Sequence, residues 1–200
     1  MVERLKIEID VGQVLSALQH LPPSAMRNAW RRTLRKTSVW VKSQTAKLVS
    51  KETKIPQKLI RQRLYFFLRN MDTGKVWLGL NDIEAHRIGT PVQRKRDVYE
   101  KAVGKHSGRT RSFYSRTDSW IQVGRYRFAS AWHMSERDPG GAIYQRTGKD
   151  RKPYEMAKVD FGQAGEKAFR AAASRVENRL MIILMQEVNY ELQNALGRAR

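Results

Sequence analysis

The sequence predicts an α+β fold: long N-terminal and C-terminal helices packed on an antiparallel β-sheet, with a basic flexible excursion in the middle. Apolar residues recur at helical spacing over residues 23–48 and again over residues 165–196. Between these stretches, short runs within 75–160 alternate in the manner of strands, and no crossover helix separates them. We therefore expect a single domain over residues 1–200.

Three helices are expected in the first third of the chain. Asp10 can cap a short helix that runs to about His20, and Pro22 and Pro23 stop it. Pro23 then starts a long amphipathic helix, whose stripe at steps of four and three is Met26, Trp30, Leu34, Thr37, Val41, Thr45 and Leu48. Residues 52–54 form a break, and Pro56 fits the first turn of a third helix that continues through Phe67.

The apolar period changes to that of strands after the third helix. A strand with one wet face is expected at 75–80, and further strands are expected at 119–123, 127–132, 142–145 and 154–160. The helical period then returns from about Gly165 to Leu196, and Gly197 is a plausible terminator. The stripe of this last helix is Phe169, Ala172, Val176, Leu180, Ile183, Val188, Leu192 and Ala195.

The chain is strongly basic, with 39 Lys and Arg against 19 Asp and Glu, a net charge of +20. Such a field attracts polyanions, and it exceeds the magnitude of about 2 to 8 that keeps a small domain soluble. The alternative is that the excess charge serves solubility alone.

A segment of about 93–116 concentrates this charge and is expected to be flexible. Tyr99, Phe113 and Tyr114 interleave with its basic residues, a composition that suits sequence-neutral contact with phosphates. The candidates for contact with nucleic acid or a partner are Arg94, Lys95, Arg96, Lys105, Arg109, Arg111 and Arg116. The alternative is a solvated loop that orders only against another protein subunit.

Six consecutive apolar residues, 180–185, place apolar side chains on every face of the last helix. Something must therefore cover the far side. The long second helix can bury it, or Met181, Ile182 and Met185 can form a subunit interface.

The residues indicate no catalytic site and no bound cofactor or metal. The chain has no cysteine, which fits folding in a reducing cytoplasm, and its four histidines stand far apart. Asp82 and Glu84, with His86 where a two-metal nuclease needs lysine, supply only a faint version of that site. The longest apolar run is far short of the ~20 residues that cross a bilayer, so no membrane contact is expected.

Two stretches resemble the minor tail protein Z family of tailed bacteriophages and prophages. One is residues 43–64, SQTAKLVSKETKIPQKLIRQRL; the other is residues 141–170, with its Gln-Arg-x-Gly-Lys-x-Arg-x-Pro core. The chain departs from the family pattern at Tyr154, where a small aliphatic residue is more usual, and over residues 81–132.

This resemblance implies a structural role in tail completion and head–tail joining, at the end of the tail that meets the head, with no known catalysis. The expected partners are other copies in a ring, other tail and neck proteins, and DNA contacted without regard to sequence. Further interface candidates are Gln145, Arg146, Lys149 and Arg151, although a tight turn made by Gly148 and Pro153 also explains that segment. The rival functions are a dedicated nucleic-acid-binding protein and a phage nuclease.

Overall fold

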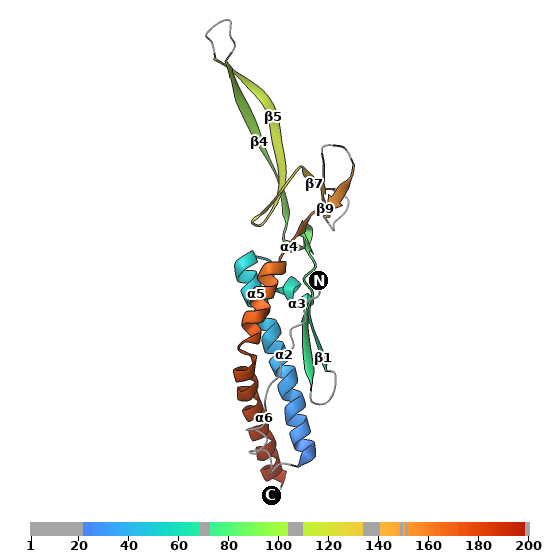
Figure 1. Ribbon diagram of the computed structural model, residues 1–200, viewed down its shortest axis with the longest axis vertical. Helices are drawn as coiled ribbons and strands as arrows, with labels where there is room; N and C mark the ends of the chain where they lie inside the picture. The colour runs from blue at the N-terminus through green and yellow to red at the C-terminus, as the bar shows by residue number, and fades with distance from the viewer. Residues whose placement is uncertain are drawn as a thin grey trace. The chain divides into compact units, whose positions relative to one another are not determined.

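The computed structural model describes residues 22–68, 73–103, 110–133, 141–148, 150 and 152–198, and only the backbone of residues 97–103, 110–118, 133, 196 and 198. It is an α+β protein that divides into two compact units, Met1–Asn81 with Phe161–Arg200, and Asp82–Asp160 (Figure 1). The single domain expected over residues 1–200 stays a prediction. The helix expected from Asp10 to His20 lies outside the described residues.

The long helix expected from Pro23 is confirmed as α2, Pro23–Thr53. Its start follows from Pro22 and Pro23, because proline is preorganised for the first helical turn and has no N–H to leave unpaired. Its end follows from Lys54, which adopts the left-handed conformation at φ 60° and donates its backbone N–H to the carbonyl of Ser50. The break expected at 52–54 therefore lies at this cap.

Most of the buried residues of α2 form a row of small side chains at every fourth position, with Ser38 and Ala46 beside it. Since four residues slightly exceed one turn, this row winds around the helix and faces different neighbours at its two ends. Ala29 packs with Leu184 and Val188 of α6, Val176–Arg198, while the last turns of α2 lie beside α5, Gly162–Ala173. The row is Ala29, Thr33, Thr37, Val41, Thr45, Val49 and Thr53.

The single C-terminal helix expected over 165–196 is two helices, which corrects that prediction. The chain turns at Ser174 and Arg175, where the N–H of Ser174 bonds to the carbonyl of Arg170 and that of Arg175 to the carbonyl of Ala172. The expected apolar stripe is nevertheless buried from Phe169 through Val188. The turn thus changes the course of the helix and keeps the stripe inside.

The third helix is shorter than expected. It is α3, Gln57–Gln62, and the chain then enters β1, Leu64–Leu68, which pairs antiparallel with β2, Gly74–Leu78. The strand expected at 75–80 is confirmed as β2, whereas helix through Phe67 is wrong. Leu64 and Leu78 are buried opposite each other, so the hairpin turns one face inward.

The second unit is made of antiparallel ladders, of which the pairing of β4 with β5 is the longest described. β4, Pro91–Val103, pairs with β5, Thr110–Val123, which pairs with β6, Tyr126–Ala129. β7, Ala131–His133, pairs with β8, Ile143–Arg146, which pairs with β9, Tyr154–Met156. β3, Ile83–Glu84, leads into α4, Ala85–Ile88, and pairs with β10, Lys158–Val159.

The strands expected in this unit are present, with two interruptions. The run 127–132 is divided between β6 and β7 at Ser130, whose φ is 53°, and the run 154–160 is divided at the buried Ala157. The described parts of the basic segment, 93–103 and 110–116, are paired strand, which the sequence analysis does not predict. Buried Ile83, Ile121, Val123 and Ile143 form the core of the unit.

Candidate functional site

The sheet β4–β5–β6 has one buried face and one exposed basic face. Residues directly opposite in an antiparallel ladder share a face. Ile121 and Phe128 are partners and both are buried, so the neighbouring pairs point the other way. The exposed side, named here the Trp120 face, carries Val92, Arg94, Arg96, Trp120, Gln122 and Arg127.

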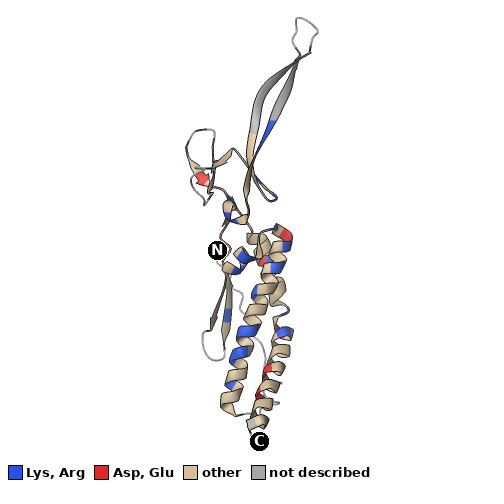
Figure 2. Ribbon diagram, turned by 180° about the vertical axis from the view of Figure 1, so that it is seen from behind, with Lys and Arg blue, Asp and Glu red and all other residues tan. Residues whose placement is uncertain are grey.

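One arginine contacts the indole ring of Trp120 on this face, and another is its register partner. The guanidinium carbon of Arg127 lies over Trp120 at 3.9 Å from the ring centroid, a cation–π contact. Arg94 is the register partner of Trp120 on β4, and Arg94 and Arg96 are both exposed. The register also places Asp118 opposite Arg96. Figure 2 shows the basic stretch in blue on the strand.

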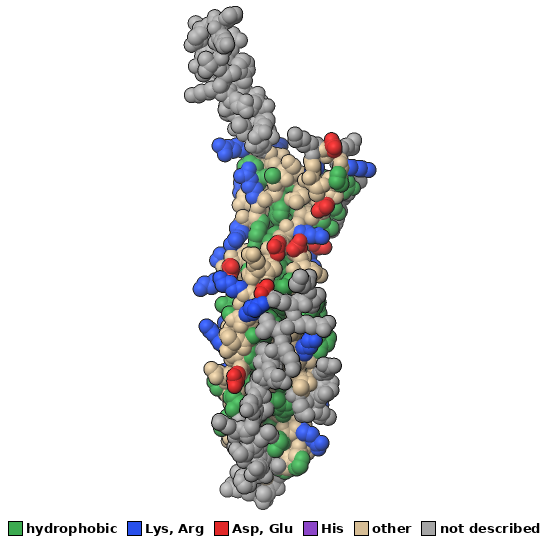
Figure 3. Space-filling view, in the orientation of Figure 1, with side chains coloured by type: hydrophobic (Ala, Val, Ile, Leu, Met, Phe, Trp, Pro, Cys, Tyr) green, Lys and Arg blue, Asp and Glu red, His purple; other side chains and the backbone are tan. Residues whose placement is uncertain are grey.

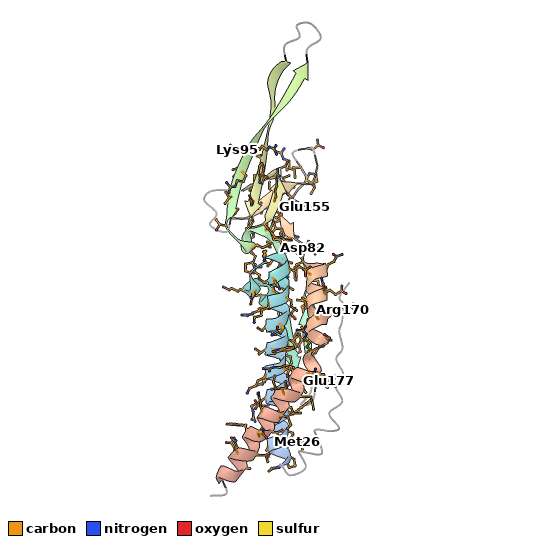
Figure 4. All side chains as sticks on the ribbon, turned by 90° about the vertical axis from the view of Figure 1, so that its left-hand side faces the viewer. Met26, Asp82, Lys95, Glu155, Arg170 and Glu177 are labelled. Atoms are coloured by element: carbon orange, nitrogen blue, oxygen red, sulfur yellow. The ribbon has the colours of Figure 1, made fainter. Side chains whose placement is uncertain are left out.

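The remaining residues of the predicted basic site fall in different places. Lys95, labelled in Figure 4, is exposed on β4 but alternates to the other face, opposite Ser119. Arg111 and Arg116 belong to the part of β5, residues 110–118, whose backbone alone is described, and Lys105 and Arg109 lie outside the described residues. Sequence reasoning missed Trp120 and Arg127. Trp120 and Arg127 lie in the expected strands 119–123 and 127–132. The alternation of inward and outward side chains along those strands is the signal that could have found them.

The apolar run 180–185 is partly covered by α2. Leu180, Ile183 and Leu184 are buried, and Met181 packs against the cluster of Ala29, Leu184 and Val188. This is what the alternative of burial by the long helix predicts. Ile182 and Met185 remain 50% and 49% exposed. These two residues are named here the α6 patch.

A second exposed apolar surface lies on the β1–β2 hairpin and was missed in the sequence, because helix was expected there. The ring of Tyr65 lies 5.5 Å from its register partner Trp77 and 6.5 Å from Phe67, centroid to centroid. Tyr65 is 46% exposed and Phe67 is 55% exposed. Together with Trp77 they are named here the hairpin patch.

The predicted contact segment 145–153 joins β8 to β9. The N–H and hydroxyl of Thr147 both bond to the carbonyl of Pro153, at 3.4 and 3.1 Å, so the alternative of a hairpin turn is supported. The guanidinium carbon of Arg146 lies 5.7 Å from the ring centroid of Trp132. Gln145 is the register partner of Ala131 on β7 and of Glu155 on β9. Lys149 and Arg151 lie outside the described residues.

An ion-pair cluster joins α2 to α6, the helix that carries the α6 patch. The side chain of Glu187 is 6% exposed and accepts hydrogen bonds from Arg32, at 2.5 Å, and from Lys36. Arg32 also donates to Glu191 at 2.5 Å. Burial works to raise the pKa of Glu187, but the hydrogen bonds and charges of Lys36 and Arg32 outweigh it, so the pKa is lowered.

Basic side chains also lie elsewhere on the molecule. Arg27, Arg31 and Arg35 are exposed at successive four-residue steps of α2, and Figure 3 shows basic side chains over much of the visible face. Like charges at this spacing repel by a few tenths of a kcal/mol per pair. These three arginines are named here the α2 row. Unlike the Trp120 face, the row consists of arginines alone.

The carboxylates considered for a nuclease are placed by β3. Glu84 Oε2 lies 3.6 Å from His86 Nε2, and Asp82 is exposed. Within the described ranges, no three or more Asp, Glu or His residues are grouped so that they could hold a metal ion. Over the same ranges, no helix combines the length and apolar character needed to span a membrane.

Comparison with known proteins agrees with the resemblance seen in two motifs. The family model described as prophage minor tail protein Z (GPZ) matches residues 11–198. No curated protein and no solved structure matches the chain. The family match spans both compact units, including the stretch 81–132, where the motif resemblance is weakest.

Proposed function

Because the chain belongs to the prophage minor tail protein Z family, we propose that it completes the tail and joins it to the head, as one subunit of an oligomeric ring at the head-proximal end. Family membership makes the chain a structural component of a phage tail. In the proposal it acts by assembly and without catalysis. Its partners are further copies of itself and other tail and neck proteins.

The observation that carries the ring is the presence of two different exposed apolar patches on one compact unit. α2 packs against α6 and against β2, and Figures 1 and 2 show it between α6 and the hairpin. The α6 patch and the hairpin patch therefore belong to elements on different sides of α2. Two unlike patches suit a head-to-tail interface, which closes into a ring when the rotation between copies permits.

The composition of the patches supports contact between protein subunits. Aromatic residues and methionine are enriched at protein interfaces, and charged residues are depleted from interface cores. The hairpin patch holds a tyrosine, a phenylalanine and a tryptophan, and the α6 patch holds an isoleucine and a methionine. Burying such side chains supplies association energy that must overcome the repulsion between chains of charge +20.

Two charge-matched variants test the head-to-tail contact. The first is Ile182→Asp with Met185→Asp, and the second is Tyr65→Asp with Phe67→Asp. Each variant should stay folded and should sediment as a monomer. Its self-association should be about 30-fold or more weaker than that of the unchanged protein, since truncating central interface residues costs about 2 kcal/mol. The control, Ser24→Asp with Val39→Asp, introduces the same charge at exposed positions of α2 and should assemble as the unchanged protein does.

Mixing the two patch variants makes the test specific. Each variant keeps the patch that the other has lost, so an equimolar mixture should form heterodimers through the one intact pair of surfaces and no larger ring. Assembly of either variant like the control would contradict the interface. A mixture that stays monomeric would contradict the pairing of these two patches.

A further inference from the structure

We propose that the Trp120 face binds the phosphate backbone of DNA without reading its base sequence. This goes beyond the proposed function, because it rests on the charge and geometry of β4, β5 and β6. Family membership enters only in the choice of DNA over RNA.

The arrangement of the arginines suits phosphate. A guanidinium offers a planar fork of N–H donors that matches phosphate oxygens, and it stays charged at every physiological pH. Arg94 and Arg96 alternate on one strand, so their backbone positions are about 6.6 Å apart on the same face. Arg127 adds a third guanidinium from β6, across Trp120 from β4.

Trp120 acts as a positioning residue for Arg127. The guanidinium carbon lies over the face of the indole ring at 3.9 Å from its centroid, and this contact limits the positions open to the guanidinium. A long, exposed arginine otherwise loses rotamer freedom when it binds. The contact with Trp120 therefore restricts Arg127 before DNA binds, so less rotamer freedom is lost on binding. The α2 row has three exposed arginines as well, but no ring within the row orders them.

The face favours a nucleic-acid backbone over a protein partner. Three arginines and one half-buried tryptophan form a charged centre that stays net positive with Asp118, the register partner of Arg96, on the same face, whereas the centres of protein interfaces are depleted of charge. Sequence neutrality is expected where guanidinium groups contact phosphates, because the backbone carries no base information. Base reading would need Arg, Asn or Gln side chains that reach base edges in a groove. Gln122, the amide on this face, donates one Nε2 hydrogen to the carbonyl of Gly124 at 3.1 Å.

The test compares two triple variants that remove the same charge. One is Arg94→Ser, Arg96→Ser and Arg127→Ser on the Trp120 face; the other is Arg27→Ser, Arg31→Ser and Arg35→Ser on the α2 row. Binding of the full chain to fluorescent single-stranded and duplex DNA of mixed sequence is followed by anisotropy across a salt series. Circular dichroism confirms that both variants are folded.

The Trp120-face variant should bind at least about tenfold more weakly and lower the slope of log affinity against log salt by up to about 2.7 on duplex, since each phosphate contact contributes about 0.9. The α2-row variant should change the slope by less than about one. Equal losses in the two variants would overturn the proposal in favour of the general field of the +20 chain. Failure of the unchanged protein to bind either DNA would overturn it outright.

Two single variants test the role of the ring. Trp120→Leu leaves the charge unchanged and should weaken binding about threefold, the size of an exposed cation–π contact. Arg127→Lys keeps the charge but loses the planar fork, so it should also bind more weakly. Full affinity in both would contradict the positioning role. DNA of permuted sequence should bind equally well, and a strong preference among sequences would contradict backbone recognition.

Discussion

At the scale of single residues, Glu187 is the acidic centre of the contact between α2 and α6. It is 4% exposed overall and bonds to Arg32 and Lys36, which lie 155 and 151 residues away in sequence. No local sequence pattern predicts these ion pairs, because their members come together only when the two helices pack.

Replacing Glu187 with Gln should destabilise the protein by about 2 kcal/mol, because hydrogen bonds to charged groups are worth about 1.5 to 3 kcal/mol. Urea unfolding at neutral pH measures the change. Glu177→Gln, at an exposed position of the same helix, is the matched control and should cost less than about 0.5 kcal/mol. Equal costs for the two variants would contradict a special role for the buried carboxylate.

The pH dependence of stability should change with the same variant. The pKa of Glu187 is lowered in the folded state, so its contribution is fully present above the unfolded pKa, about 4.3, and is lost as pH falls through the lower folded value. The unchanged protein should therefore lose more stability than Glu187→Gln between pH 6 and pH 3, by about 2 kcal/mol at most. Parallel stability curves for the two proteins would contradict the lowered pKa.

At the scale of elements, helices with proline starts were predictable and two other features were not. The start of α2 at Pro23 and its end near residue 53 follow from local chemistry. β1 was missed because Leu59, Ile60, Leu64 and Phe67 fit helical spacing equally well, and pairing with β2 decides the conformation. The turn at Ser174 carries neither glycine nor proline, so tertiary packing sets it.

The cap of α2 yields a paired prediction. Lys54 occupies a left-handed position that costs a residue with a Cβ about 1 kcal/mol, and glycine avoids that cost. Lys54→Gly should therefore stabilise the protein, by up to about 1 kcal/mol. Lys51→Gly, three residues earlier inside the last turn, should destabilise it by about 1 kcal/mol. Thermal unfolding measures both, and changes of the same sign would contradict the cap.

At the scale of the whole molecule, the α+β class was predictable from the two helical periods that enclose an alternating middle. The candidate surfaces were predictable only in part. Arg94, Arg96, Ile182 and Met185 were identified because basic clustering and all-round apolarity are visible in sequence. Trp120, Arg127 and the hairpin patch depend on strand register, which joins residues from separate segments and leaves only a weak local signal.

Salt should act in opposite directions on the two proposed interactions. Screening weakens repulsion between copies of a +20 chain, so assembly through apolar patches should strengthen as salt rises. Contact between arginines and phosphate should weaken over the same range. Sedimentation and DNA anisotropy on one salt series measure both. A common direction for the two would show that one kind of interaction underlies both.

We propose that the chain is a ring subunit where the tail meets the head. Imaging of assembled virions labelled with an antibody against this chain tests it most directly. We expect label confined to the head-proximal end of the tail, over a closed ring of copies. Label at the distal tip, along the whole tube, or absent from infectious particles would contradict it.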